Sequence, residues 1–391
     1  MMNKHLTSIL LVSGTCIGAG MIALPMSLAK IGIIPSVILM FFIWLYSYYT
    51  SLVIVELNLQ TEEKNLSLEE LCRKYSGKTA EIIGNLCVKL LCYSLIAAYI
   101  YGGSSIIQNL FSLNTNIIYI QTCLAFATIL VLQTNKDYIS NLNGHFFLSF
   151  IGLLFFLIIL LFIKVDYNNI PALHSASFSK ISTIIVVCFT SFGYQICSPA
   201  LIKHSNNDIK ILKNAFLYGS FIPLVVYSCW TFVILSVLYN NDIGFYENII
   251  CDNVTVGSLV NKLSQVLSLN NLNIIVWLIS IFAIFTSLIG VSLGLTESYN
   301  NVFKEKGIKK YNLLSTLISI IPSYIITVLI PDAFIKILEY AGIISVIMAI
   351  LLPIYLYLKA DIKSQYIKIL NKPTLIFCFI LGIVMILLCF M

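Results

Sequence analysis

Three glycines and a proline interrupt the first strongly apolar stretch of the chain, residues 13–25 (SGTCIGAGMIALP). Gly14, Gly18 and Gly20 each lower helix propensity by about 1 kcal/mol, and Pro25 lacks an N–H donor and clashes with the preceding turn. Inside a membrane, backbone groups released in this way must be satisfied by protein, water or a ligand. The stretch therefore suggests a binding site, although small residues at this spacing also permit close helix packing.

The same pattern returns in the sixth apolar run, at residues 189–199 (FTSFGYQICSP). Gly193 lies in mid-run among polar neighbours, and Pro199 follows about one and a half turns later. Interrupted helices at the first and sixth positions predict two inverted repeats of five spans, with the sixth entering from the opposite side.

Three ionisable residues lie within or at the ends of apolar runs, where such groups often mark ion pathways. Glu56 lies near the inner end of the second run and Glu297 at the inner end of the eighth, so solvated end residues are the simpler interpretation. Lys89 lies about 12 Å into the third run, where snorkelling to the interface is the alternative. All three are candidates for cation coupling.

The amino-acid composition indicates that these residues belong to a membrane protein. The chain has 391 residues, of which 59% are hydrophobic and 10% charged, and its mean hydropathy is +0.95. Continuous apolar runs predict helices, because a spanning β-strand would alternate over about 10 residues. We predict eleven spans, at residues 7–29, 35–57, 82–110, 117–133, 146–163, 181–201, 215–239, 272–295, 313–330, 334–358 and 374–390.

These runs predict an all-α membrane protein with one transporter domain, residues 1–391. The first repeat covers about 7–164, the second about 181–358, and an extra helix covers about 374–390. The first run is too long and too rich in glycine for a signal peptide, so we expect it in the mature structure.

Basic residues are distributed unevenly between the connecting segments on the two sides of the membrane. With the N-terminus inside, the inner segments hold Arg73 and most of the lysines. The outer segments hold only Lys30, Lys164, Lys180, Lys262 and Lys336. The positive-inside rule therefore predicts the N-terminus inside and the C-terminus outside. This asymmetry accounts for the net charge of +6 without any nucleic-acid partner.

Two connecting segments carry helical signals of their own. Ser67 and Glu70 form a capping box on the inner side, and Gly77 predicts the end of that helix. On the outer side, apolar residues recur at helical spacing over 256–267. The outer helix either orders a loop or forms a lid over an outer vestibule.

Four spans resemble the bacterial aromatic amino acid permeases, the tyrosine and tryptophan transporters. Residues 14–25 (GTCIGAGMIALP) resemble the first-helix signature of that family. Supporting likenesses are residues 97–103 (AAYIYGG), 191–194 (SFGY) with Pro199, and 286–295 (TSLIGVSLGL). The resemblance runs along nearly the whole chain, and eleven spans is the usual number in the family.

The resemblance implies a member of the amino acid, polyamine and organocation superfamily with the five-plus-five inverted repeat of the leucine transporter. Substrate would bind at mid-membrane between the unwound parts of spans one and six. The protein would lie in the bacterial cytoplasmic membrane and import an aromatic amino acid, tyrosine or tryptophan, by cation symport. A proton is the cation expected from the family.

Backbone groups at the two interruptions could hold both ends of an amino acid. Amides at the start of the outer half-helix would bind the carboxylate. They belong to Gly18, Ala19, Gly20 and Met21. Carbonyl oxygens around Phe192 and Gly193 would accept hydrogen bonds from the ammonium group.

Side-chain selectivity requires an aromatic-sized pocket with a polar corner. The residues expected there are Tyr99, Tyr101, Tyr194 and Gln195. Most aromatic residues of such a chain pack in the interior or lie at the membrane interface. For each of these aromatic side chains, that position is the alternative to substrate contact. The family pattern leads us to expect Phe-Gly-Phe-His where residues 192–195 read Phe-Gly-Tyr-Gln, so no imidazole is available for a proton role at Gln195.

The resemblance also implies a cation site between spans one and eight. Thr286 and Ser287 match the hydroxyl pair that ligates a cation there in the leucine-transporter fold, which keeps sodium open. Some proton-coupled relatives place an ammonium group from the fifth span at this point, and the fifth span here has no mid-membrane lysine.

Other classes fit the sequence less well. A membrane enzyme would gather acidic, histidine or arginine residues at one face, but Arg73 is the only arginine and the four histidines are far apart. We find no catalytic triad, phosphate loop, metal-ligand spacing or cofactor motif, and the eleven cysteines resemble packing residues. A transporter of another neutral amino acid, or a channel or sensor with the same fold, remains an alternative.

Overall fold

The computed structural model describes residues 4–18, 20–61, 66–173, 178–267, 273–305, 311–330 and 334–390, and its regular elements are all helical. The first nine helices are α1 (Lys4–Cys16), α2 (Gly20–Leu28), α3 (Ile33–Leu59), α4 (Leu68–Ser76), α5 (Lys78–Leu110), α6 (Ile117–Leu132), α7 (Lys136–Ile163), α8 (Phe178–Ser191) and α9 (Ser198–His204). The others are α10 (Ile209–Asn241), α11 (Ile243–Ile250), α12 (Val256–Val266), α13 (Asn273–Glu305), α14 (Tyr311–Leu329), α15 (Phe334–Val346), α16 (Leu352–Lys359) and α17 (Lys372–Leu388). A 3₁₀ turn, η1 (Tyr194–Cys197), joins α8 to α9, and a π turn, η3 (Ile347–Leu351), joins α15 to α16.

Each of the eleven predicted spans corresponds to a helix or to a pair of helices. Among the described residues, eight spans are long and apolar enough to cross a membrane, and the bent pair of α1 and α2 makes a ninth. The other two, α6 and α17, are apolar helices of 16 and 17 residues. Crossing by these two helices, and the repeat symmetry, stay predictions.

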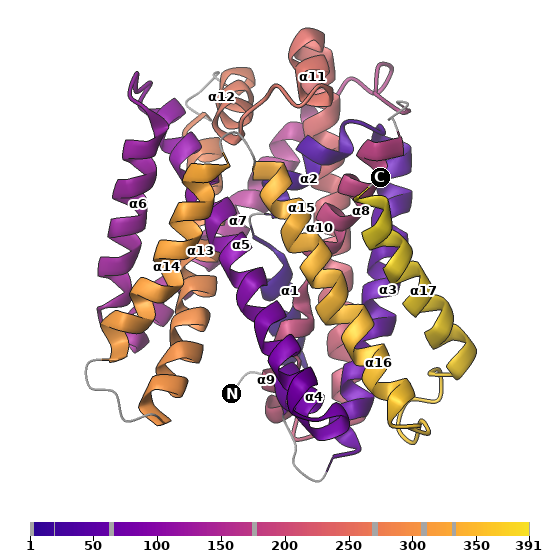
Figure 1. Ribbon diagram of the computed structural model, residues 1–391. Coiled ribbons are helices and arrows are strands. Elements are labelled where there is room, and N and C mark those ends of the chain that lie inside the picture. The colour runs from indigo at the N-terminus through magenta and orange to yellow at the C-terminus, as the bar shows by residue number, and fades with distance from the viewer. Residues whose placement is uncertain are drawn as a thin grey trace.

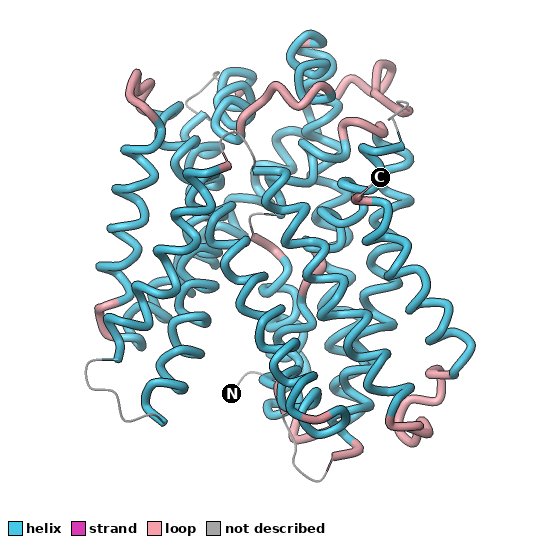
Figure 2. The backbone as a smooth tube through the Cα atoms, viewed as in Figure 1, coloured by secondary structure: helices cyan, strands magenta, loops and turns pink. Residues whose placement is uncertain are grey.

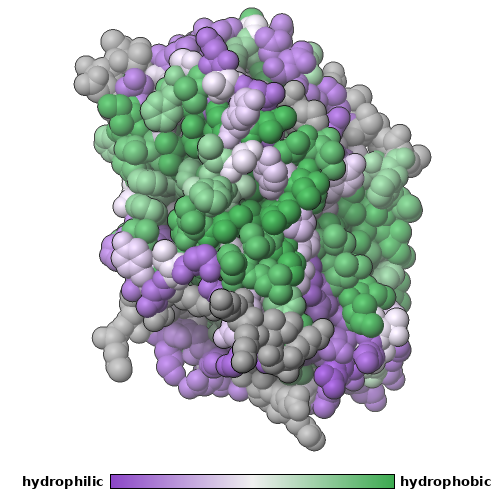
Figure 3. All heavy atoms as spheres, turned by 60° about the vertical axis from the view of Figure 1, so that its left-hand side comes forward, coloured by the Kyte–Doolittle hydropathy of each residue, from purple (hydrophilic) through white to green (hydrophobic). Residues whose placement is uncertain are grey.

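The helices run between two opposite faces of the molecule (Figure 1). We call the face that carries the start of α1 and all of α4 the N-terminal face, and the opposite face, with α11 and α12, the α12 face. Figure 3 shows apolar side chains gathered across the middle of the surface and hydrophilic residues toward both faces. This pattern is typical of a membrane protein whose apolar middle zone contacts the hydrocarbon core of the bilayer.

The two connecting helices form as their sequences predict. The Ser67 hydroxyl accepts a hydrogen bond from the Glu70 N–H, the Glu70 carboxylate accepts one from the Ser67 N–H, and α4 ends at Gly77, where φ is 87°. On the opposite face α12 covers most of the predicted stretch. The sequence analysis did not find α11, which the Asp242 side chain caps by accepting from the Phe245 N–H.

The π turn η3 was also not predicted. Pro353 lies two residues after its end and has no N–H to donate to the preceding turn, which loosens the helical ladder there. Gly382 of α17 packs against this turn, since a Cβ at that glycine would lie 3.0 Å from the Leu351 side chain.

Candidate functional site

Two spans are interrupted at mid-height, where the sequence predicts a break. The first is interrupted between Cys16 and Gly20, and its two helices meet at an angle of 54°. The second is interrupted at Phe192 and Gly193, after which the chain continues as the 3₁₀ turn η1. Figure 2 shows both interruptions as loop segments halfway between the two faces.

A cavity of about 780 Å³ lies where the interruptions meet. Six of the predicted site residues line it, namely Gly18, Gly20, Tyr99, Gly193, Thr286 and Ser287. From there it extends toward the N-terminal face, along Leu10 and Leu11 of α1 and Ser298 of α13. The structure therefore brings residues of spans one, three, six and eight to one cavity.

Gly18 and Gly20 line the cavity and also permit close helix packing. A Cβ at Gly18 would lie 2.5 Å from the Ser287 hydroxyl oxygen, and a Cβ at Gly20 would lie 2.7 Å from that of Ser191. A side chain at Gly18 would require the Ser287 hydroxyl to move, and one at Gly20 would also press on the Ser191 Cβ at 3.1 Å. The two interpretations of these glycines are thus compatible.

The amides predicted to hold a carboxylate are not all available. The Met21 N–H donates to the Gly18 carbonyl oxygen at 3.0 Å, and the Met21 side chain is fully buried, so Met21 does not present a free amide. The Gly18 N–H approaches the Tyr227 hydroxyl oxygen. Ala19 lies outside the described residues. Gly20, which begins the nine-residue α2, is left as the predicted residue that brings a helix N-terminus to the cavity.

Four predicted pocket residues lie behind the cavity wall instead of on it. Tyr101 is buried in α5, and the Phe192 ring packs edge-on against Tyr227 with centroids 5.7 Å apart. The 3₁₀ turn directs Tyr194 and Gln195 toward neighbouring helices. The Tyr194 ring lies 5.8 Å from that of Phe216, and the Gln195 side-chain amide donates to the carbonyl oxygen of Ser47 at 3.4 Å.

The two hydroxyls that the sequence predicts as cation ligands, those of Thr286 and Ser287, lie together on α13. Thr286 donates its proton to the Phe282 carbonyl oxygen at 2.7 Å, and Ser287 donates to that of Ala283 at 2.9 Å. The Ser287 hydroxyl also makes a hydrogen bond with the Tyr99 hydroxyl. Thr286 and Ser287 both line the cavity. Among the described residues no cluster of three His, Cys, Asp or Glu side chains offers a metal site.

The three ionisable candidates lie away from the cavity lining. Glu56 is fully buried, and one carboxylate oxygen accepts from the Gln60 amide at 2.6 Å and from the Gln365 N–H at 2.8 Å, so the interpretation as a solvated end residue is wrong. This carboxylate thus contacts the segment between α16 and α17. Glu297 is exposed, as expected for an end residue. The Lys89 ammonium lies 4.5 Å from the centre of the Tyr299 ring, a cation–π contact between α5 and α13.

Three residues of α7 that line the cavity, Asn143, Gly144 and Phe147, were not predicted from the sequence. The predicted fifth span began at residue 146, whereas α7 begins ten residues earlier. The side-chain amide oxygen (Oδ1) of Asn143 is buried and finds no hydrogen-bond partner among the described residues. The polar stretch ahead of the apolar run, residues 140–145, was the available signal.

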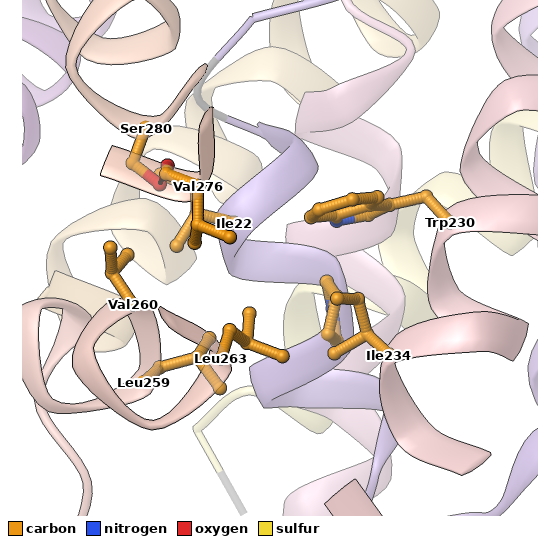
Figure 4. A pocket seen from close by; sticks show the side chains of 9 residues that line it. Ile22, Trp230, Ile234, Leu259, Val260, Leu263, Val276 and Ser280 are labelled. Atoms are coloured by element: carbon orange, nitrogen blue, oxygen red, sulfur yellow. Dashed lines mark hydrogen bonds between the residues drawn. The ribbon is translucent and has the colours of Figure 1, made fainter. Parts of the chain in front are cut away.

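On the α12 face the route to the interruptions is closed. Leu259, Val260 and Leu263 of α12 point toward Ile22 of α2 and Trp230 of α10 (Figure 4). The space left between them is about 10 Å³, at the lower limit for one water molecule. An amino acid cannot pass here in this conformation.

The fold defines a polytopic helical membrane protein, and a cavity between interrupted spans is typical of transporters of small molecules. The chain belongs to the tryptophan/tyrosine permease family, whose model matches residues 1–389. Members of this family are permeases and not enzymes.

Characterised relatives align over most of the chain. It is 30% identical over 362 residues to the tyrosine-specific transport system 1 of Haemophilus influenzae, covering 92% of this chain and 89% of that protein. It is 28% identical over 365 residues to the glutamine transporter 2 of Aliivibrio fischeri, covering 90% and 88%. It is 26% identical over 372 residues to the low affinity tryptophan permease of Escherichia coli, covering 91% and 87%.

Proposed function

We propose that this protein imports aromatic amino acids, tyrosine or tryptophan, across the bacterial cytoplasmic membrane by cation symport. The observation that carries the proposal is the cavity of about 780 Å³ between the two interrupted spans. Small-molecule pockets commonly measure roughly 300–1,000 Å³, a range that accommodates an aromatic amino acid. The names of the tyrosine and tryptophan relatives support this substrate class.

The substrate carboxylate lies at the N-terminus of α2, where Gly20 meets the cavity, and the ammonium group faces the carbonyl oxygens around Gly193. The aromatic ring lies between Tyr99 of α5 and Phe147 of α7. This arrangement uses no buried charged side chain for the zwitterion. It is supported by the membership of all four residues in one cavity lining.

The N-terminal face is the cytoplasmic one in this proposal. The excess of lysines near that face supports the assignment by the positive-inside rule. The cavity then extends to the cytoplasm, and the conformation is the inward-facing one of an alternating-access cycle. The two repeats, residues 7–164 and 181–358, move relative to each other between states.

Coupling to a proton is proposed, with sodium at Thr286 and Ser287 as the alternative. Movement of one charge inward supplies about 2.3 kcal/mol per 100 mV, enough for about 50-fold accumulation. The position of both hydroxyls on the cavity lining supports the sodium alternative. The family resemblance favours the proton.

Uptake into proteoliposomes tests substrate and cation together. We expect saturable uptake of labelled tyrosine or tryptophan when an inward proton gradient is imposed, with the sodium gradient applied in a separate arm. Competition by phenylalanine and by glutamine ranks the substrates. The glutamine transporter among the relatives makes glutamine the second candidate, and preferential glutamine uptake would replace the aromatic assignment.

A further inference from the structure

One face of α10 follows the first span along its whole length. Gly219 lies against α1, since a Cβ there would be 2.7 Å from the Cβ of Val12. Tyr227 reaches the interruption, and Trp230 reaches α2. The spacing of eight and then three residues keeps all three on one helical face. The helix that lies behind the broken span is therefore a continuous one.

The Tyr227 hydroxyl meets carbonyl oxygens that the two interruptions leave without their helical donors. In an unbroken helix the carbonyl of Cys16 would accept from residue 20, and that of Ser191 from residue 195, but both helices end before those residues. The hydroxyl donates to the Cys16 oxygen at 2.6 Å and lies 3.4 Å from the Ser191 oxygen. One fully buried side chain thus contacts both interrupted spans.

Trp230 meets a second backbone defect of the same span. The helical donor for the Met21 carbonyl oxygen would be the N–H of residue 25, but that residue is Pro25 and has none. The Trp230 indole N–H donates to this oxygen at 2.8 Å. An N–H from α10 therefore replaces the one that the proline removes.

We propose that Tyr227 and Trp230 are positioning residues for the substrate site. Tyr227 does not line the cavity, so it acts by holding the two interruptions at the separation that the substrate requires. Because a hydroxyl has one proton, Tyr227 satisfies one carbonyl fully and leaves the other a weak contact. Trp230 fixes the direction in which α2 leaves the interruption. The proposal rests on the proposed function, because it takes the interruptions as the place where substrate binds.

Tyr227→Phe removes only the bridging hydroxyl. We expect the KM for the preferred aromatic amino acid to rise about tenfold, as for loss of a buried hydrogen bond, with Vmax changed less than twofold. The matched control is Tyr75→Phe, which removes a hydroxyl that donates to the Leu57 carbonyl oxygen at 2.8 Å, far from the cavity. Equal KM values for the wild type and Tyr227→Phe, or an equal rise in the control, would overturn the role of Tyr227.

The effect of Trp230→Phe can be reversed by a second substitution if Trp230 acts through its hydrogen bond, but not if it acts only by packing. Loss of the indole N–H leaves the Met21 oxygen unsatisfied, so we expect KM to rise several-fold. Adding Pro25→Ala supplies an N–H at residue 25 within α2, and we expect the double variant to recover most of the lost affinity. Trp44→Phe, which loses a bond to the Ser220 hydroxyl at 2.9 Å, serves as the control for indole loss. A double variant no better than Trp230→Phe would overturn the role of Trp230.

Amide hydrogen exchange separates this inference from the proposed function. We expect exchange over α2 to be faster in Trp230→Phe than in the wild type and slower again in the double variant, with or without substrate. A wild type that shows no melting shift with tyrosine or tryptophan would remove the proposed function but leave this measurement valid. If Tyr227→Phe does not fold, the rescue of Trp230→Phe still decides whether α10 holds the broken span.

Discussion

The two halves of the first span differ sharply in their packing. Every residue of α2 after Gly20 is buried, whereas Leu6, Leu10 and Leu11 of α1 are 48%, 46% and 38% exposed. Both halves come from one apolar run, but α1 carries Lys4, His5 and four hydroxyl residues, whereas Ser27 is the one polar side chain of α2. The difference therefore reflects both the sequence of each half and what surrounds it.

The far end of α2 is held by the segment that carries α11 and α12. The Tyr246 hydroxyl donates to the Ala29 carbonyl oxygen at 3.1 Å. The buried Lys30 ammonium lies 2.5 Å from an Asp252 carboxylate oxygen, and Lys180 at the start of α8 lies 3.8 Å from the other oxygen. Both interrupted spans thus meet the same aspartate on the α12 face.

On the N-terminal face, none of the residues that the structure describes covers α1 along the cavity in a comparable way. It packs closely against α10 at Gly219, and its other side lines the space between α5, α7 and α13. In an alternating-access cycle the loosely covered half is the one that can move to close the cavity, while α2 must first leave α12 to open the other face. Contacts of α1 should therefore affect closure of the cavity at the N-terminal face, and contacts between α2 and α12 should affect opening of the α12 face.

The largest effect is expected at the junction of the two halves. Gly18→Leu places a side chain where even a Cβ would lie 2.5 Å from the Ser287 hydroxyl, so it should abolish tyrosine or tryptophan uptake in proteoliposomes. Gly152→Leu is the control, because nothing lies within 4 Å of a Cβ there. Normal insertion of both variants, with uptake lost only in the first, is the expected result. Uptake retained by Gly18→Leu would move the site elsewhere.

The closed α12 face should loosen when its apolar contact is reduced. Leu263→Ala enlarges the small cavity above α2 and should destabilise the closed arrangement by about 2–5 kcal/mol. We expect faster amide exchange in α12 and α2, with exchange in α1 unchanged. Leu148→Ala, at a side chain that is 73% exposed, provides the control. Equal acceleration in α1 would show that the two halves do not respond separately.

A smaller effect is expected at the hydroxyl pair beside the junction. Thr286→Val keeps the side-chain shape but removes the oxygen lone pairs, so the concentration of the coupling cation that gives half-maximal uptake should rise about fivefold to tenfold. Thr128→Val is the matched control, since Thr128 makes the same bond to its own helix, donating to the Leu124 carbonyl oxygen at 2.8 Å. Unaltered cation dependence in Thr286→Val would argue against a ligand role at this position.

Sequence patterns predicted the helices and the interruptions because both depend on local chemistry. Apolar runs set the spans, and Gly18, Gly193 and Pro25 mark where helical bonding fails. The side-chain contacts were harder to predict because they depend on how the turn after each interruption is wound. The 3₁₀ geometry of η1 directs Gln195 toward Ser47, and the early start of α7 brings Asn143 to the cavity. Neither follows from the spacing of apolar residues.

The smallest expected effect concerns a carboxylate that orders the α12 face. Asp242 caps α11, and its carboxylate lies 2.5 Å from the Lys262 ammonium of α12. The hydrogen bond from Lys262, followed by that from the Phe245 N–H, lowers the pKa of Asp242 below its ordinary value of 3.8. Because the pKa is lowered in the folded protein, the ionised Asp242 carboxylate stabilises the fold at any pH above its ordinary pKa. This stabilisation is lost as the pH falls through the lower pKa of the folded state.

The α12 face should therefore keep this support from neutral pH down to about pH 4 and lose it only in stronger acid. Asp242→Asn should speed amide exchange in α11 and α12 slightly at pH 7 and remove the additional acceleration below pH 4. Asp361 follows α16, and its ion pair with Lys372 likewise lowers the pKa of its carboxyl group. Substitution of Asp361 therefore provides the matched control. Asp361→Asn should leave exchange in α12 unchanged, because its carboxylate orders only the segment before α17. Equal responses to both substitutions would mean that acid acts on the whole protein, and the α12 face would then not be closed by contacts of its own.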